Sequence, residues 1–233
     1  MNSRRGLLPT LALGLIVALT ASPVAAQTRV GEAAVVKNQV VRVAASSTTQ
    51  INVGDALLRD EVVRTGLESA ARLVMADSTN LSLGPNASLK LDRTVFDDEH
   101  HYRDIAIRLT SGAFRFVTGH SDKGSYKITT PLATIGVRGT VLDILSQRGK
   151  TTVVLQDGAS TVCSAKRQCL DLTQPGDTAI ITSSGGHTTI QKTNNPPWTF
   201  AATCTQAAGL CTVTQYADAT PVDDDPTGML CGR

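Results

Sequence analysis

Apolar and polar side chains alternate along much of this chain, in short runs. The residues between the apolar positions are largely polar, for example Ser82, Lys90 and Arg115. Successive side chains of a β-strand point to opposite faces, so this pattern predicts strands with one buried and one solvated face. The apolar members of the runs are Leu73/Met75, Leu81/Leu83, Leu89/Leu91, Ile105/Ile107/Leu109 and Phe114/Phe116.

Turn-forming residues separate these runs. Glycine, proline, asparagine and aspartate supply the backbone angles and side-chain hydrogen bonds that a tight reversal needs. Strands therefore recur about every ten residues, and no long helical period appears between residues 30 and 190. The sequence predicts an all-β fold, either an antiparallel, hairpin-rich sandwich or jelly-roll, or a short β-solenoid. The turns lie at residues 77–80, 84–86, 111–112, 119–124, 157–158 and 175–177.

The two ends of the chain differ from this middle part. Residues 1–26 combine a short basic start, an apolar run too short to span a bilayer, and small residues at Val24 and Ala26, which is typical of a cleaved secretory signal peptide. "SRRGLL" leaves the twin-arginine and general export routes both open. We expect a β domain at residues 27–186 and an irregular tail containing proline, threonine and cysteine at 187–233. In the tail, Trp198 either anchors the segment on the β surface or stacks on a ligand.

Charge narrows the choice of partners. The 233 residues contain 22 basic and 20 acidic side chains, and removal of residues 1–26 takes away two arginines and no acid. The exported chain would then be neutral, which argues against nucleic acid as a partner. No second apolar segment reaches spanning length, so we expect no membrane span after cleavage and a periplasmic, or extracellular, location.

The segment "TPLATIGVRGT" at 130–140 places two glycines and an arginine in the most apolar stretch of the chain that follows residue 26. Ile135 is apolar at an odd position and Leu142 at an even one, so the chain changes faces between them, which requires a bulge or a tight corner. A phosphate-binding loop would need a lysine and a following helix, which this segment lacks. Arg138 has two open roles: to bond carbonyls at the bulge or an acid such as Asp143, or to anchor a carboxylate of a partner or ligand. The glycines assigned to turns or bulges are Gly136, Gly139, Gly112 and Gly158.

Disulfides are the default state of cysteines in an exported protein. Cys163 and Cys169 flank a short turn between two strand-like runs, so we expect them to be bridged. A second bridge, Cys204 to Cys211, is expected in the tail, with Cys231 left over. Neither pair has the spacing of a zinc site.

Catalytic chemistry finds little support in the sequence. The run of acids and histidines at 96–101 resembles a solvated hairpin tip more than a metal site, because neighbouring strand residues face opposite ways. No nucleophile elbow or zinc-protease helix accompanies the four histidines. We therefore expect no metal, no cofactor and no enzymatic activity.

Several segments, taken in order, resemble the FecR domain family. They are "VGDALLRDEVVRTGLESAARLVMADSTNLSLGPNASLKL", "IRLTSGAFRFVTG", "YKITTPLATIGVRGTVLDI", "TTVVLQDGAS" and "QPGDTAII", together spanning about residues 30–185. The resemblance implies an all-β periplasmic domain without catalytic residues. In the best-known members this domain senses an outer-membrane siderophore transporter and relays its occupancy to a sigma factor.

The chain departs from that arrangement, because an expected signal peptide stands where an anti-sigma segment and a transmembrane helix would be needed. We therefore expect a free-standing exported form that binds or senses a partner of the cell envelope without relaying to a sigma factor. The main alternative is a protein that binds envelope glycans. Glycan platforms usually display several aromatic rings, and this chain has eight aromatic residues in all. That favours a protein partner.

Overall fold

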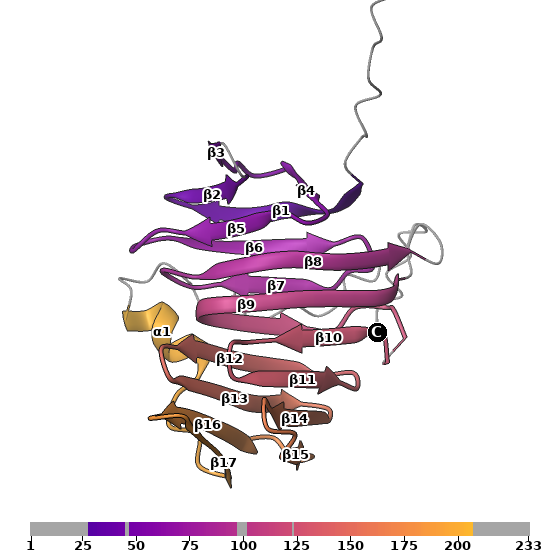
Figure 1. Ribbon diagram of the computed structural model, residues 1–233. Helices are drawn as coiled ribbons and strands as arrows, with labels where there is room; N and C mark the ends of the chain where they lie inside the picture. Colours follow the sequence, from indigo (N-terminus) through magenta and orange to yellow (C-terminus); the bar gives the residue numbers. More distant parts are fainter. Residues whose placement is uncertain (1–27, 45–46, 97–101, 123, 207–233) are drawn as a thin grey trace, which may run out of the picture.

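The computed structural model describes residues 28–44, 47–96, 102–122 and 124–206. Almost all of this part is β-structure, arranged as two open sheets whose strands succeed one another along a stack (Figure 1). The predicted all-β fold is confirmed. The predicted signal peptide and the tail beyond residue 206 lie outside the described residues.

The first sheet, sheet A, contains nine strands. In spatial order they are β4 (Ala56–Leu58), β1 (Arg29–Lys37), β6 (Ala70–Met75), β7 (Asn80–Leu83), β9 (Tyr102–Val117), β12 (Val141–Gln147), β13 (Lys150–Asp157), β16 (Thr178–Ser184) and β17 (His187–Thr193). All of these pairings are antiparallel.

The second sheet, sheet B, shares strand β9 with the first. In spatial order its strands are β3 (Thr48–Gln50), β2 (Val40–Val43), β5 (Val62–Thr65), β8 (Ser88–Phe96), β9, β10 (Tyr126–Thr129), β11 (Ala133–Val137), β14 (Ser160–Ser164) and β15 (Cys169–Leu172). The β9–β10 pair is parallel. From β10 onward, hairpins alternate between the two sheets, and this combines the sandwich with the stepwise advance of a solenoid.

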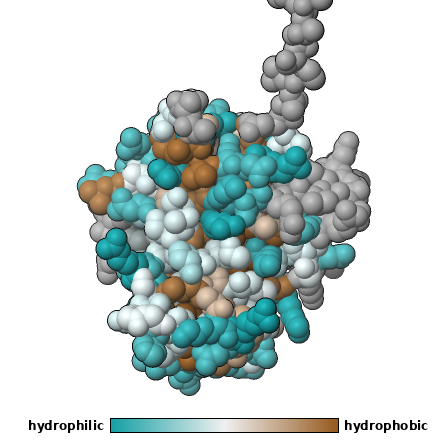
Figure 2. Space-filling view, in the orientation of Figure 1, coloured by the Kyte–Doolittle hydropathy of each residue, from teal (hydrophilic) through white to brown (hydrophobic). Residues whose placement is uncertain are grey.

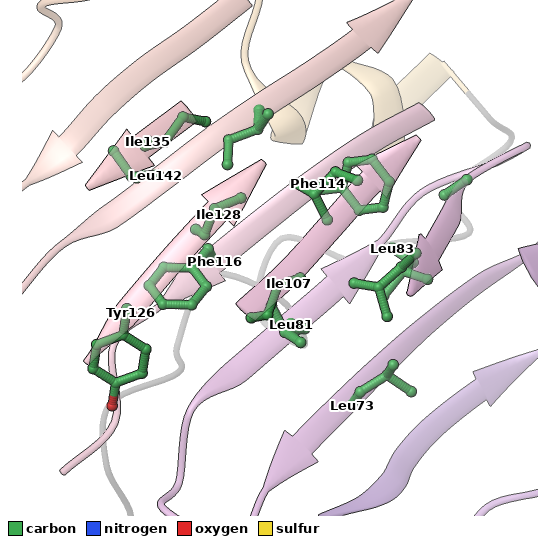
Figure 3. Packing of buried hydrophobic residues seen from close by; sticks show 14 of the residues in the cluster. Leu73, Leu81, Leu83, Ile107, Phe114, Phe116, Tyr126, Ile128, Ile135 and Leu142 are labelled. Atoms are coloured by element: carbon green, nitrogen blue, oxygen red, sulfur yellow. The ribbon is translucent and has the colours of Figure 1, made fainter. Parts of the chain in front are cut away.

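The two sheets face each other across one hydrophobic core. Leu81, Phe116 and Leu142 lie opposite one another on three neighbouring strands of sheet A. The ring of Phe116 meets Tyr126 of sheet B edge to face, with 5.6 Å between the ring centres (Figure 3). These contacts place the apolar half of the alternating pattern between the sheets, as period-two alternation requires.

Strand β9 passes from one sheet to the other at Gly112. Residues 105–111 pair in sheet B, and residues 112–117 pair in sheet A. The φ of Gly112 is +103°, and a Cβ there would lie 2.4 Å from Ala87 Cα. Glycine is needed because any other residue would be strained at this φ and its Cβ would collide with the backbone of Ala87.

A second pair of crossovers meets at Gly139 and Gly158. Gly139 (φ +66°) lies between β11 and β12, and Gly158 (φ +82°) between β13 and β14. A Cβ on Gly158 would lie 1.9 Å from the carbonyl oxygen of Gly139. Gly136 differs, because it lies inside the regular strand β11 and a Cβ there would make only an ordinary contact. The face change is therefore a corner between sheets at 138–139, and Gly136 is not part of it.

The strand region extends past the expected domain limit at residue 186. Strand β17 pairs along its whole length with β16. Its sequence reads as a polar tail because β17 is an edge strand with mostly exposed or half-exposed residues. The helix α1 (Phe200–Gln206) then turns back onto sheet A and contacts β9 and β12 (Figure 1).

Candidate functional site

Residues 198–203, which include the first turn of α1, are anchored on the outer face of sheet A. Phe200 is 1% exposed and packs with Ala70, Ala113 and the half-buried Trp198. The Trp198 indole N–H donates to Thr203 Oγ1 at 2.6 Å. Trp198 is therefore part of the cluster around Phe200, and both of its predicted roles, an anchor on the β surface or a ring that stacks on a ligand, stay predictions.

Asp143 is the polar centre of this contact. Its carboxylate is fully buried and accepts two hydrogen bonds from Arg115, at 2.7 and 3.0 Å. It also accepts from the Gln156 side chain and from the Phe200 backbone N–H, both at 2.9 Å. The Arg115 guanidinium lies 5.7 Å from the centre of the Phe200 ring. A buried carboxylate with four donors is a satisfied structural group, so this cluster holds the segment in place.

Arg138 lies at the corner between β11 and β12. Its backbone N–H donates to Ala159 O at 3.1 Å, and its side chain is exposed. Asp143, the predicted intramolecular partner, is bound by Arg115 instead. Within the described part of the chain, no hydrogen bond or ion pair of the Arg138 guanidinium is found, so the role of an anchor for a partner's carboxylate stays a prediction.

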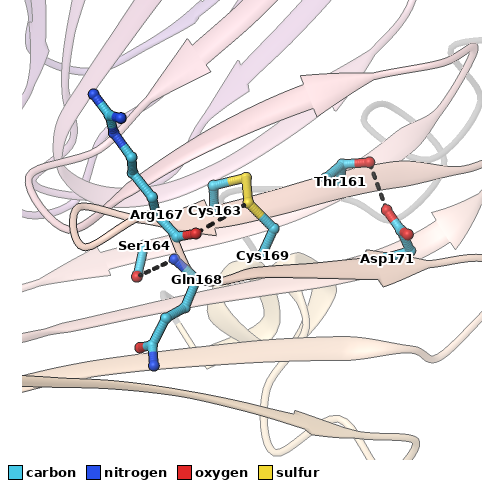
Figure 4. The surroundings of a disulfide bond; sticks show 7 residues. All are labelled: Thr161, Cys163, Ser164, Arg167, Gln168, Cys169 and Asp171. Carbon is cyan, nitrogen blue, oxygen red and sulfur yellow. Dashed lines mark hydrogen bonds between the residues drawn. A yellow bond between two sulfur atoms is a disulfide. The ribbon is translucent and has the colours of Figure 1, made fainter.

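The disulfide between Cys163 and Cys169 is confirmed. It joins β14 to β15, and Thr161 on the same hairpin donates to Asp171 at 2.7 Å (Figure 4). The disulfide limits fraying of this edge hairpin, because a cross-linked hairpin gains less conformational entropy on opening than one without the bridge. The predicted bridge between Cys204 and Cys211, and Cys231, involve side chains outside the described residues.

A cavity that the sequence did not reveal lies at the N-terminal end of the stack. It has a volume of about 440 Å³. Its walls come from both sheets: Val43 from β2, Leu58 from β4 and Val62 from β5, with the charged residues Arg42, Asp60 and Glu61 among them. On the face drawn in Figure 2, a group of hydrophobic residues also gathers at this end.

Glu61 is the unusual group of this cavity. Its residue surface is 9% exposed, and neither carboxylate oxygen accepts a hydrogen bond of normal geometry from the described residues. Burial raises its pKa, and the charge of Arg42 and a backbone contact with Leu58 offset only part of that rise. Arg42 Nη1 lies 3.6 Å from Glu61 Oε2, while Arg42 Nη2 donates to Ala56 O at 2.8 Å.

One signal in the sequence could have revealed this group. Glu61 occupies the same phase as Val63 and Thr65, and all three are buried. Arg42 likewise pairs opposite Val63 and shares the phase of buried Val40. Charged residues in phase with a buried face indicate either an internal ion pair or a site.

Other site chemistry is sparse. Among the described residues no three His, Cys, Asp or Glu side chains are arranged to hold a metal ion. The run at 97–101 lies outside them. In the same described part, no helix is long and apolar enough to cross a bilayer.

The chain is thus an all-β protein in which a buried, fully hydrogen-bonded cluster around Asp143 lies on the outer face of sheet A. A cavity with charged residues in its lining lies at the N-terminal end of the stack. Residues 61–159 match the family model described as FecR protein, so this segment carries the predicted FecR resemblance.

Two solved structures are similar to the chain, both of a candidate anti-sigma factor from Parabacteroides distasonis ATCC 8503. Each shares 15% identity with this sequence, over 57% of this chain and 59% of that one, with TM-scores of 0.48 and 0.47. The match thus spans less than two thirds of that protein. A search among curated proteins found no match.

Proposed function

We propose that the protein is an exported, non-enzymatic FecR-type module that binds or senses another protein of the cell envelope. The observation that carries this proposal is the match of residues 61–159 to the regulatory FecR family. The signal-like segment at 1–26 supports export, and the disulfide between Cys163 and Cys169 is in keeping with an oxidising compartment.

The open sheet edges supply surfaces for such a partner. Among the described strands, β3, β4, β15 and β17 each pair with a single neighbour. An extended segment of another protein can add to such an edge through main-chain hydrogen bonds. The edges at the N-terminal end lie beside the cavity of Glu61, whereas the β14–β15 edge is cross-linked and β17 is mostly polar.

The test is affinity purification of the tagged full chain from cross-linked envelope extract. We expect recovery of one protein in near-stoichiometric amount. N-terminal sequencing of the recovered chain should begin at Gln27. Retention on peptidoglycan or exopolysaccharide without a protein companion would favour the glycan-binding alternative and contradict the proposal.

A further inference from the structure

The outer face of sheet B carries one basic residue on, or directly after, each of five neighbouring strands. Strands β5, β8, β9, β10 and β11 pair in this order and succeed one another along the stack (Figure 1). Each basic residue is exposed or half-exposed and follows a buried residue, so its side chain points away from the core. The five residues, which we call the basic stripe, are Arg64, Lys90, Arg108, Lys127 and Arg138.

The described acids on these strands do not balance the stripe. Lys90 and Arg108 lie directly opposite each other, and Asp92 accepts a hydrogen bond from each, at 2.8 and 2.7 Å. The other described acid is Asp104, which gives five positive charges against two negative ones. The remaining three members of the stripe have no hydrogen bond or ion pair with any described residue. Their charges are therefore not used by the fold.

The two sheets differ in what lies on their charged faces. Residues 198–203 cover the Arg115–Asp143 pair on sheet A, whereas the three cations without partners on sheet B are exposed. An excess of one charge on an exposed face attracts partners of the opposite sign and repels those of the same sign. The stripe therefore selects an anionic partner.

The middle of the stripe leaves room between its long side chains. Gly136 lies opposite Lys127, and a Cβ there would come only within 3.8 Å of Thr161 O, so the fold does not require a glycine. On the other side of Lys127, a hollow of about 340 Å³ is lined by the small residues Ala106 and Thr129 and by charged side chains. The main chain of a partner can therefore approach the sheet between the cations.

The spacing of the stripe fits an extended polypeptide. Arg138 is offset by two residues from Lys127 across the antiparallel β10–β11 pair, and Arg64 is offset likewise from Lys90 across β5–β8. Offsets of this kind separate the Cβ atoms by about 7–8 Å. In an extended chain every second side chain faces the same way, with a repeat of about 6.8 Å. Carboxylates at alternate positions of one extended segment therefore meet successive members of the stripe.

The composition of this face argues against a sugar polymer as the anion. Glycan platforms usually display aromatic rings, because sugar faces stack on them. The aromatic side chains described on these strands, Phe114, Phe116 and Tyr126, are all buried in the core. The cations are thus presented without a stacking platform, which favours a polypeptide that carries carboxylates.

We propose that the basic stripe binds an extended acidic segment of the envelope protein, with carboxylates at alternate positions. The inference rests on the proposed function for the presence of a protein partner, and on the stripe for the chemistry of its segment. Lys127 and Arg138 bind carboxylates directly, since a charge-assisted hydrogen bond is stronger than one between neutral groups. Lys90 and Arg108, already bonded to Asp92, attract the segment at longer range.

The experiment measures binding of labelled peptides to the full chain by fluorescence anisotropy. The first probe is a heptapeptide in which glutamate and threonine alternate, and the second has glutamine in place of glutamate. A third probe has the composition of the first, with its glutamates consecutive. We expect saturable binding of the alternating acidic peptide that weakens as salt is raised, with about tenfold weaker binding of the glutamine peptide and about threefold weaker binding of the consecutive one.

The double variant Lys127→Gln/Arg138→Gln removes two cations of the stripe and no hydrogen bond between described side chains. We expect it to weaken binding of the alternating peptide about tenfold, with an unchanged circular dichroism spectrum. The matched control, Arg148→Gln/Lys150→Gln, removes the same charge from the β12–β13 hairpin of sheet A. It should bind the peptide within about twofold of the unaltered chain, because it leaves the stripe intact.

Four results would contradict the proposal. Equal binding of the alternating and the glutamine peptides, or equal losses in the two double variants, would overturn the stripe as the site. Equal binding of the two acidic peptides would overturn the alternating arrangement. Displacement of the alternating peptide by a lower carboxylate concentration of polygalacturonate would overturn the protein source in favour of a glycan. Tighter peptide binding by the variant Asp223→Asn/Asp224→Asn/Asp225→Asn would assign the stripe to the tail of this chain and overturn the partner as its occupant.

The same variants separate this inference from the proposed function. An envelope protein recovered equally by the unaltered chain and by the Lys127→Gln/Arg138→Gln chain would support the function and overturn the stripe as its site. Stripe-dependent binding of the alternating peptide, without any envelope protein in the purification, would support the chemistry of the stripe and contradict the function.

Discussion

The outer faces of the two sheets each carry an arginine–aspartate pair with the same separation. Arg115 and Asp143 on sheet A, and Arg108 and Asp92 on sheet B, both approach to 2.7 Å. The side-chain exposures differ: 12% and 0% for the first pair, 58% and 28% for the second. The segment with Trp198 and Phe200 covers the first pair, whereas the second lines a shallow surface hollow of about 340 Å³.

This difference shows that distance alone does not tell what an ion pair contributes. The pair on sheet B remains in water, so its attraction is screened and offset by the loss of side-chain freedom. The pair on sheet A has lost its water, so each member depends on its protein partners. On sheet A the charged pair therefore binds residues 198–203, whereas on sheet B the Arg108–Asp92 pair remains exposed to solvent.

The largest expected effect comes from removing the buried carboxylate. Asp143→Ala leaves the Arg115 guanidinium under the Phe200 ring without its partner, and leaves the Phe200 N–H and the Gln156 amide without an acceptor. We expect the free energy of unfolding to fall by about 3–5 kcal/mol, measured by urea denaturation. The double variant Arg115→Met/Asp143→Leu should recover much of this loss. A loss below about 1 kcal/mol would show that the covered pair behaves like an exposed one.

Removing the Phe200 ring, which covers the Arg115–Asp143 pair, should have the next largest effect. The ring is 1% exposed, so Phe200→Ala should lower the free energy of unfolding by about 1.5–3 kcal/mol through lost apolar burial. We expect release of residues 198–203, seen as faster amide hydrogen exchange there, with the two-sheet core still protected. Asn195→Ala, an exposed position in the same segment, is the matched control. Unchanged exchange in the Phe200→Ala chain would contradict an anchoring role for the ring.

Glu61 tests the contrast between satisfied and unsatisfied buried carboxylates. Its pKa is raised in the folded protein by burial, with Arg42 offsetting part of the rise and Asp60 the other acid in the cavity lining. The folded state therefore holds the proton more tightly than the unfolded state does, and the contribution present at low pH is lost as the pH rises from about 4.5 through the raised value. Urea midpoints across pH 4–7 should show this loss, and Glu61→Gln should abolish that part of the pH dependence. The same slope in both proteins would exclude Glu61 as its source.

The smallest effect is expected on the face of sheet B. Asp92→Ala should change the free energy of unfolding by about 0–1 kcal/mol, and 1 M salt should remove the difference. Hydrogen bonds from Lys90 and Arg108 lower the pKa of Asp92, so its small contribution is present at neutral pH and is lost as the pH falls through that lowered value. A loss comparable to that of Asp143→Ala would remove the distinction between the two faces.

The sequence predicted the class of fold and several local features well. Alternation at Phe114/Phe116 and Leu81/Leu83 placed these side chains on the buried face, because strand periodicity is a property of the local chain. The bridge between Cys163 and Cys169 followed from two cysteines flanking a short turn, since a hairpin brings such positions together.

The candidate sites were harder to predict. The partner of Asp143 is Arg115, 28 residues away, and the pair is neighbouring only because β9 and β12 lie side by side in sheet A. Glu61 carried a signal, its shared phase with Val63, but its free oxygens depend on where Arg42 and Ala56 lie.

By itself, the sequence determined that the described chain forms strands, where it turns, and which face of each strand avoids water, because these follow from side-chain alternation and from the backbone angles of glycine, proline and asparagine. The tertiary structure decided which sheet each hairpin joins and which charged groups lose their water. Those outcomes depend on contacts between residues far apart in the chain, such as Phe200 over Arg115 and Arg42 beside Glu61.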